Sequence, residues 1–299
     1  MSLTPFPFLF MVGLALLATA AASVTAVVAV DATRGGTDLF ATATGVPPVA
    51  AAAYVVLDAD TGRPLAAVDA DERRPVGSLA KLMTAHLALQ AGEPDRSVTV
   101  PDLDVAGDES QVGLVPGSVE RRATLIEATL VASANDAART LAVDVGGDEA
   151  RFVAMMNDEA AALGLDDTRY ANPVGLDDPD QWSTALDVAG LADRLMDDAA
   201  FRAVVDDPSV SVDDRDHAST NDLLGVYTGA DGIKTGHTDD AGWCIAASAT
   251  RDGRRVIVVV LGAPTEEARD GAATTLLDWA FAAPAADGHG SSRPDVVAV

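Results

Sequence analysis

A serine and a lysine three residues apart, Ser78 and Lys81, are the residues of this sequence whose types and spacing best suit chemistry. Pro75 and Gly77 interrupt the preceding segment, and apolar residues then recur at helical spacing, so a buried helix is expected to begin at or near Ser78. Side chains three residues apart share one face of a helix. The Ser78 hydroxyl would then lie beside the Lys81 amine and the free N–H groups of the first turn. That position suits both an attacking serine and a developing negative charge.

The choice of lysine at position 81 is itself informative. Lys81 and Lys234 are the two lysines among the 20 basic residues of the chain, and the others are arginines. An ammonium can lose its proton when it is desolvated, whereas a guanidinium cannot, so Lys81 is predicted to be a general base. Lys234 opens a Lys-Thr-Gly tripeptide, and a Ser-Ala-Asn tripeptide at 133–135 lies between the two lysines. The joint occurrence of these motifs is far more specific than any one of them.

The motifs S-x-x-K, S-x-N and K-T-G together are the signature of penicillin-binding proteins and class A β-lactamases. The chain resembles the serine-type D-alanyl-D-alanine carboxypeptidases, which are low-molecular-mass penicillin-binding proteins. The likeness covers most of the chain between residues 46 and 283 and includes the segments 78–84, 133–138, 163–164, 172–176, 183–185, 220–224 and 231–238.

The resemblance implies an α+β fold of the β-lactamase/transpeptidase-like type, a mainly antiparallel sheet flanked by helices with an inserted helical lobe and the active site between sheet and lobe. The sequence pattern indicates the same arrangement. Strand-like runs at 54–57 and 64–68, and again at 232–238, 243–250 and 254–261, enclose a helical middle, and a helix is expected over 266–281. Early and late strands must bury their apolar faces together, so the middle is predicted to be the inserted lobe.

The expected catalytic group consists of four residues. Ser78 would form an acyl-enzyme with the penultimate residue of a peptide, and Lys81, neutral in the ground state, would take the serine proton. Ser133 would pass a proton to the leaving amine, and Asn135 would hold Lys81 and the substrate amide. Lys234 would be the second cation that helps to lower the pKa of Lys81.

Substrate binding is expected along the Lys-Thr-Gly strand. Thr235 would bind the terminal carboxylate, and Gly236 would let the substrate lie close to the strand. The backbone N–H groups of Ser78 and His237 would form the oxyanion hole. The resemblance also assigns Arg269 as a carboxylate clamp, although a surface ion pair with neighbouring Glu266 would explain an arginine there equally simply.

Several alternatives remain open at this point. A lone serine at a helix start is most often an N-cap, so the role of Ser78 depends on its partners. A class A β-lactamase would need a glutamate that activates the deacylating water. Between Asn135 and Lys234 the chain has only Glu149 and Glu159, both in helix-like sequence, which disfavours that activity. A DD-endopeptidase and a non-catalytic penicillin-binding protein are the remaining alternatives.

The composition limits the partners. A formal net charge of -26 would repel nucleic acid and anionic membranes, and the expected partners are a cell-wall peptide and covalently bound β-lactams. Abundant aspartate, scarce lysine and 4% aromatic residues resemble proteins of extreme halophiles, with an acidic protein of a high-GC mesophile as the alternative. No cofactor or metal is expected, because the four histidines lack ligand spacing. The one cysteine, Cys244, is expected to pack in the core.

The ends of the chain differ from its centre. Residues 1–30 carry no charge and are long enough either for a signal peptide or for an N-terminal membrane anchor. Both place the protein outside the cytoplasm, secreted or attached to the outer face of the membrane. Residues 31–47 are predicted to be a flexible spacer, 48–283 the serine peptidase domain, and 284–299 a disordered tail.

The charge predicts that stability depends on salt. Self-repulsion should loosen the fold at low ionic strength and weaken as salt shortens the screening length. The thermal unfolding midpoint, measured from about 0.1 M to about 3 M salt, is therefore expected to rise clearly. A flat or falling curve would contradict the halophile interpretation and leave the catalytic one untouched.

Overall fold

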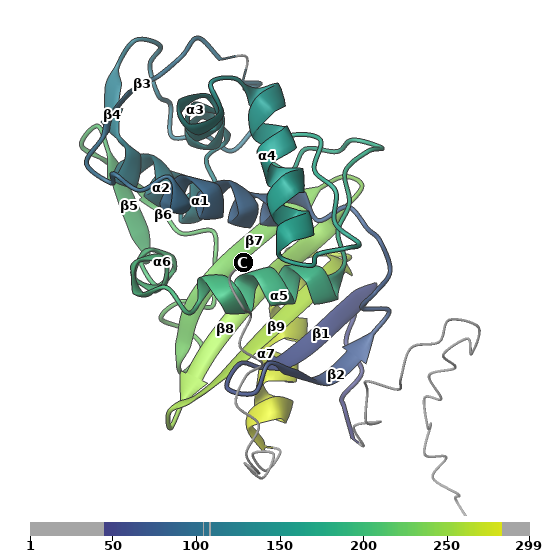
Figure 1. Ribbon diagram of the computed structural model, residues 1–299. Coiled ribbons are helices and arrows are strands. Elements are labelled where there is room, and N and C mark those ends of the chain that lie inside the picture. The colour runs from purple at the N-terminus through teal and green to yellow at the C-terminus, as the bar shows by residue number, and fades with distance from the viewer. Residues whose placement is uncertain (1–44, 104, 108, 283–299) are drawn as a thin grey trace, which may run out of the picture. The chain divides into compact units, whose positions relative to one another are not determined.

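The computed structural model describes residues 45–103, 105–107 and 109–282 (Figure 1). The apolar segment 1–30, the spacer up to residue 44 and the tail 284–299 lie outside the described residues, so the expectations for them stay predictions. Within the described part of the chain, no helix is both long enough and apolar enough to cross a membrane.

A five-stranded antiparallel sheet joins the early and late parts of the chain. Its strands are β1 (Ala53–Asp58), β2 (Arg63–Val68), β7 (Ala230–Thr238), β8 (Gly242–Arg251) and β9 (Arg254–Ala263). They lie in the order β2-β1-β9-β8-β7, so the early hairpin pairs directly with the last strand. The register places Val56 opposite Val258. The prediction that early and late strands form one sheet is confirmed.

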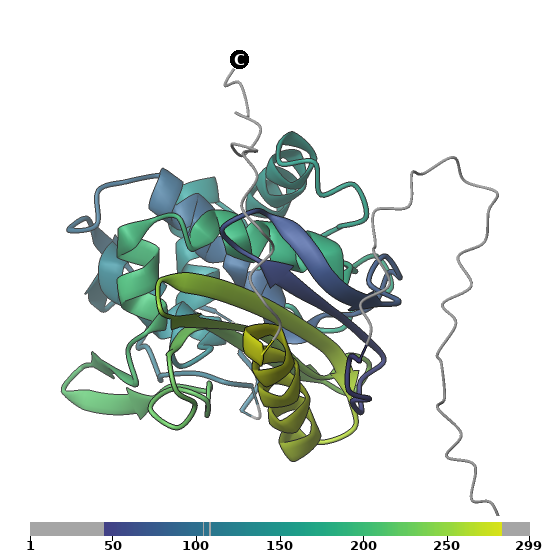
Figure 2. The same ribbon diagram turned by 90° about the horizontal axis from the view of Figure 1, so that it is seen from below.

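Both faces of this sheet are covered, which explains why its strands are almost continuously apolar. Along β9, Ile257 and Val259 belong to one core and Val256 and Val258 to the other, because successive side chains of a strand point to opposite faces. Helix α7 (Glu266–Ala282) packs on one face, and helix α5 (Ala185–Leu195) packs on the other with the helical lobe (Figures 1 and 2).

The middle of the chain forms the predicted lobe. Its other helices are α1 (Lys81–Gln90), α2 (Arg122–Leu130), α3 (Asn135–Gly146), α4 (Glu149–Ala162) and α6 (Ala199–Val205). The apolar face of α4 is buried at Phe152, Met156 and Ala160, as its spacing predicts. Helix α5 begins after Thr184, whose hydroxyl accepts a hydrogen bond from the Asp187 N–H at 3.0 Å and so caps the helix.

The expectation of a purely helical middle is wrong in two places. Strands β3 (Ser97–Thr99) and β4 (Val119–Arg121) form one small sheet, and β5 (Ser209–Val212) and β6 (Arg215–Ala218) form another. Strands this short carry too few residues for an alternating pattern to stand out. The β5–β6 turn uses Asp213 and Asp214 at φ of 50° and 59°. Glycine is the usual residue at such positions, so the turn was not predicted.

The serine of the S-x-x-K motif lies in a 3-10 turn that precedes the α-helix. Residues Gly77–Ala80 form a 3-10 turn, η1, that runs directly into α1 at Lys81. Ser78 is therefore the second residue of η1, and no side chain caps this turn or α1. The N-cap alternative for Ser78 is thereby removed. Cys244 is fully buried in the core, as expected.

Candidate active site

The residues predicted to do chemistry meet at one cleft of about 920 Å³ between β7, η1 and the start of α3. The cleft is lined by Ser78, Ser133, Asn135, Thr235, Gly236, His237 and Arg269. Lys81 and Lys234 lie buried against it, and each is hydrogen-bonded to one of the lining residues or its backbone. All nine predicted site residues are thus brought together.

Ser78 and Lys81 are in direct contact. Lys81 Nζ lies 2.7 Å from Ser78 Oγ and donates to the carbonyl of Val174 at 2.9 Å. The Lys81 side chain is 0% exposed. Burial, with nearby Lys234 as the next cause, holds the pKa of Lys81 well below its usual range. The amine can therefore be neutral and accept the serine proton.

Lys234 is also buried and lies in the middle of strand β7. Its Nζ donates to the carbonyl of Thr235 at 2.8 Å. Burial, and the charge of Arg269 after it, lowers the pKa of Lys234 to about 7. A cation here disfavours a second one at Lys81. The predicted role of Lys234 as the neighbouring cation fits these causes.

The segment after α4 supplies the acceptor for Lys81. Asn172 Oδ1 accepts the N–H groups of Val174, Gly175 and Leu176 at 3.2, 2.8 and 3.1 Å, which folds the segment into a tight turn. This turn presents the Val174 carbonyl to Lys81. Thr84 Oγ1, one turn along α1, donates to the preceding carbonyl, that of residue 173, at 2.6 Å and fixes the turn against the helix.

Glycines allow three backbone segments to converge on Ser78. A Cβ at Gly236 would lie 2.8 Å from the Val76 carbonyl oxygen and 3.0 Å from the Ser78 nitrogen. A Cβ at Gly175 would lie 2.0 Å from the Gly77 carbonyl oxygen. The absence of a side chain at Gly236 thus accommodates the turn that carries Ser78, and the predicted close approach of substrate to Gly236, which also lines the cleft, stays a prediction. Strand β7 and η1 are placed side by side by this contact.

The Ser-Ala-Asn motif lies across the cleft at the start of α3. Ser133 has a left-handed backbone conformation, φ 58°, which is strained for a residue other than glycine and is typical of functional sites. Asn135 donates from Nδ2 to the carboxylate of Glu109. Asn135 Oδ1 is buried and has no hydrogen-bond partner among the described residues.

The end of the cleft that would bind a carboxylate is formed by Thr235 and Arg269. Thr235 Oγ1 contacts Thr220 Oγ1 at 2.7 Å. Arg269 is 2% exposed and pairs with Asp270 at 2.7 Å, Glu266 at 3.4 Å and Asp222 at 3.5 Å. The predicted pair with Glu266 therefore exists, yet it is not a solvated surface pair. The guanidinium is buried and lines the cleft.

Three contributors were missed in the sequence. Glu109 precedes Asn135 in the chain, whereas a glutamate of the β-lactamase kind was expected only between Asn135 and Lys234. The Val174 carbonyl is a backbone group that every residue has, so the residue type at position 174 does not indicate its contact with Lys81. Thr220 lies in a segment that carries the resemblance, and the pattern gave no sign that it meets Thr235.

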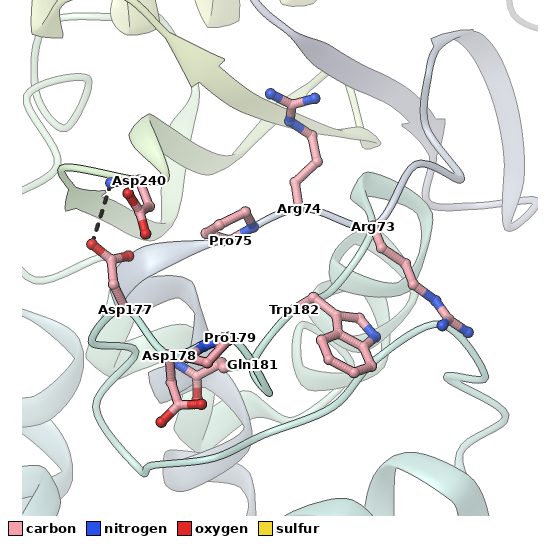
Figure 3. Close-up of a pocket in the computed structure, with 9 residues that line it drawn as sticks. All are labelled: Arg73, Arg74, Pro75, Asp177, Asp178, Pro179, Gln181, Trp182 and Asp240. Atoms are coloured by element: carbon pink, nitrogen blue, oxygen red, sulfur yellow. Dashed lines mark hydrogen bonds between the residues drawn. The ribbon is translucent and has the colours of Figure 1, made fainter.

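A second hollow of about 450 Å³ lies beside the cleft and shares Asp177 with it (Figure 3). Its walls include Arg73, Asp178 and Trp182. Asp177 accepts hydrogen bonds from Thr238 Oγ1 and from the Asp240 N–H at 3.2 Å, which ties this wall to the end of β7. None of the predicted site residues lines this hollow. Among the described residues, no group of three His, Cys, Asp or Glu side chains is arranged to hold a metal ion.

The fold is that of the penicillin-binding proteins. The structure is similar to that of penicillin binding protein 6B from Escherichia coli, with a TM-score of 0.76 and 33% sequence identity over 80% of this chain and 79% of that one. It is also similar to penicillin-binding protein D2 from Listeria monocytogenes in its ampicillin-bound form, with a TM-score of 0.72 and 34% identity over 79% and 98% of the chains. The predicted β-lactamase/transpeptidase-like fold is confirmed.

The family model for the S11 peptidases, described as D-alanyl-D-alanine carboxypeptidase, matches residues 40–265. The chain belongs to this family. D-alanyl-D-alanine carboxypeptidase DacF from Bacillus subtilis is 33% identical over 237 residues, which are 76% of this chain and 61% of DacF. The chain therefore spans less than two thirds of the length of this relative.

The packing around Ser78 predicts different effects for two glycine substitutions. Gly175 and Gly164 both have positive φ, 89° and 71°, but a Cβ at Gly164 meets nothing within 4 Å. Gly164→Ala should cost about 1–2 kcal/mol of stability from backbone strain alone and keep full acylation of Ser78. Gly175→Ala should also displace the Ser78 turn and slow acylation by about 10²-fold.

Thermal unfolding and the rate of labelling by a fluorescent penicillin measure the two effects. Equal labelling rates for the two variants would show that the close approach of residues 175 and 77 does not position Ser78.

Proposed function

We propose that this protein is a serine-type D-alanyl-D-alanine carboxypeptidase. It removes the C-terminal D-alanine from D-alanyl-D-alanine-terminated cell-wall peptides through an acyl-enzyme on Ser78. The observation that carries the proposal is the 2.7 Å contact between Ser78 Oγ and the buried amine of Lys81, whose pKa is lowered. Membership in a family described by this activity supports it.

Acylation begins with proton transfer from Ser78 Oγ to the neutral Lys81 amine. The serine oxygen attacks the carbonyl carbon of the last peptide bond, and a tetrahedral oxyanion forms. The backbone N–H groups of Ser78 and His237 would stabilise this charge, which is supported by the fact that both residues line the cleft. Collapse of the intermediate needs a proton on the leaving amine. Ser133 at the cleft wall delivers it and takes the proton of the Lys81 ammonium in return, which leaves Lys81 neutral for the hydrolytic step.

Hydrolysis completes the cycle. Free D-alanine leaves, a water molecule attacks the ester carbonyl, and Ser78 regains its proton as the shortened peptide departs. Lys81 accepts the proton of the attacking water and returns it to Ser78, the reverse of its role in acylation. Asn135 orients the substrate through the amide carbonyl that precedes the reacting bond.

Specificity for a free C-terminus is assigned to Thr235 and Arg269. The Thr235 hydroxyl lines the cleft next to the reacting serine, and the buried guanidinium of Arg269 supplies positive charge at the same end. A guanidinium pairs strongly with a carboxylate. An endopeptidase cuts within a chain and has no such carboxylate to bind, so a buried Arg269 in the cleft favours the carboxypeptidase.

We also infer the location and organisation of the protein. The uncharged segment 1–30 supports export, with the mature domain at 48–283 acting outside the cytoplasm, secreted or anchored to the outer face of the membrane. Residues 31–47 would be the spacer, and 284–299 a disordered tail. The net charge of -26 supports a halophilic host.

The direct test is release of D-alanine from a D-alanyl-D-alanine-terminated peptide by the purified full chain in high salt. Wild type should release one D-alanine per peptide, and Ser78→Ala should release none while unfolding at the same temperature. A blocked peptide that ends in an amide should be a poor substrate, because it lacks the carboxylate that Arg269 and Thr235 bind. Cleavage of the amide and the free acid at equal rates would favour the endopeptidase.

Benzylpenicillin should acylate Ser78 and remain bound. Its ring opening leaves the leaving group tethered beside the ester, so water attacks slowly. Glu149 pairs with Arg139 and Glu159 with His86, and neither lines the cleft, so neither can serve as the base of a β-lactamase.

Intact-protein mass spectrometry should show one adduct on the peptide that contains Ser78. Rapid turnover of the drug would instead indicate a β-lactamase-like hydrolase, and a folded protein with no adduct would indicate a non-catalytic scaffold.

A further inference from the structure

Glu109 is a half-buried carboxylate that lines the cleft and that the reaction described above does not use. Both of its oxygens are engaged. Oε1 accepts the Ala106 N–H at 3.1 Å, and Oε2 accepts Nδ2 of Asn135. The Glu109 N–H in turn donates to the Ala106 carbonyl at 3.1 Å. The side chain is therefore fixed in one position.

The segment that carries Glu109 is itself attached to the catalytic motif. The Asn135 N–H donates to the Ser110 carbonyl at 2.7 Å. Asp136, which is 4% exposed, accepts the N–H groups of Val112, Gly113 and Leu114 at 3.2, 2.8 and 2.9 Å. Two consecutive residues at the start of α3 thus bind this segment along its length. Glu109 is consequently held at a fixed place relative to Asn135.

The contact with Glu109 determines how the Asn135 carboxamide is turned. An ionised carboxylate only accepts hydrogen bonds, so it selects the amide N–H end of the carboxamide. The carbonyl end, Oδ1, is then directed away from Glu109 and is buried with no partner among the described residues. Nδ2 keeps a second N–H for a substrate carbonyl. Glu109 therefore orders both ends of a group that would contact substrate.

Glu109 also differs in sign from the other charges that act on Lys81. Lys234 on β7 and Arg139 on α3 are cations and lower the pKa of Lys81, as burial does to a larger extent. Glu109 raises that pKa. The balance among these groups sets the pH above which the Lys81 amine is neutral.

We propose that Glu109 is a positioning residue for the acylation of Ser78, which fixes the Asn135 carboxamide by a hydrogen bond and supplies a negative charge beside the Lys81 amine. The inference rests on the proposed function, because it concerns the same acylation step. The two contributions are separable, since glutamine carries no charge but keeps one acceptor oxygen, which can still accept the hydrogen bond from Asn135 while the bond from the Ala106 N–H is given up.

The test compares Glu109→Gln, Glu109→Ala and the control Asp102→Asn, which removes one charge from an exposed site in the same segment. The rate of acylation by a fluorescent penicillin is measured against pH. A lysine base works when neutral, so the rate rises as pH passes its pKa. Loss of the Glu109 charge lowers that pKa, and the rise should move to lower pH.

Glu109→Gln should show this shift and keep the wild-type plateau rate at high pH. Glu109→Ala should show the shift and also a plateau reduced about tenfold, since Asn135 is no longer held. Asp102→Asn should match wild type. Thermal unfolding of each variant checks that the fold is intact, and the partial exposure of Glu109 and the exposure of Asp102 make the three substitutions tolerable.

Three results would overturn the inference. If wild type is not labelled at all, the proposed function fails and the inference fails with it. If wild type is labelled and the Glu109→Gln profile superimposes on it, the inference alone fails. If Glu109→Gln acylates normally and only hydrolyses its acyl-enzyme more slowly, Glu109 acts on the deacylating water instead.

Discussion

The active site depends on keeping the Lys81 amine away from water. A charged ammonium in a water-free interior is costly, and the group responds by losing its proton. Here the helical lobe packs on one face of the sheet, and Lys81 lies at that junction with 0% exposure. Lys234 and Arg139 add to the effect of burial. The same two-layer packing that stabilises the domain therefore lowers the pKa of a residue that is ordinarily a cation, as the proposed role of Lys81 as a base requires.

Close backbone packing is the second requirement, because a base is useful only if the serine is held beside it. The turn that carries Ser78 lies between β7 and the 172–176 segment, and side chains at Gly175 or Gly236 would occupy its space. One consequence is that the Val174 carbonyl reaches Lys81. The other is that residues of η1 and β7 line a common cleft. Geometry at the reacting atom is thus fixed by main chain, which has little conformational freedom once packed.

The sequence predicted most of what depends on residue type or long patterns. Strands buried on both faces are long apolar runs, so the sheet could be identified, and Ser78, Lys81 and Lys234 were distinctive through their spacing and the scarcity of lysine. Features that depend on three-dimensional proximity were missed. Glu109 lies 26 residues before Asn135 in sequence, and nothing in its own neighbourhood indicates that they meet. The β5–β6 hairpin was missed because its turn uses two aspartates where glycine is usual.

The net negative charge of the protein repels the carboxylate of the proposed substrate, and salt screens this repulsion. The terminal carboxylate of the proposed substrate has the same sign as the net charge of -26, so at low ionic strength the field of the protein opposes its approach. Molar salt shortens the screening length to about 3 Å and removes this repulsion beyond contact distance, whereas buried cations are screened much less. Arg269 and Lys234 are 2% and 1% exposed.

The same screening affects the immediate neighbours of Arg269. Its partner Asp222 is 64% exposed at the side chain, and Glu266 is 47% exposed. Salt weakens the hold of such exposed carboxylates on the guanidinium. A substrate carboxylate that enters the cleft and loses water would keep most of its attraction. High ionic strength would therefore favour both the fold and the binding of the anionic end of the proposed peptide substrate.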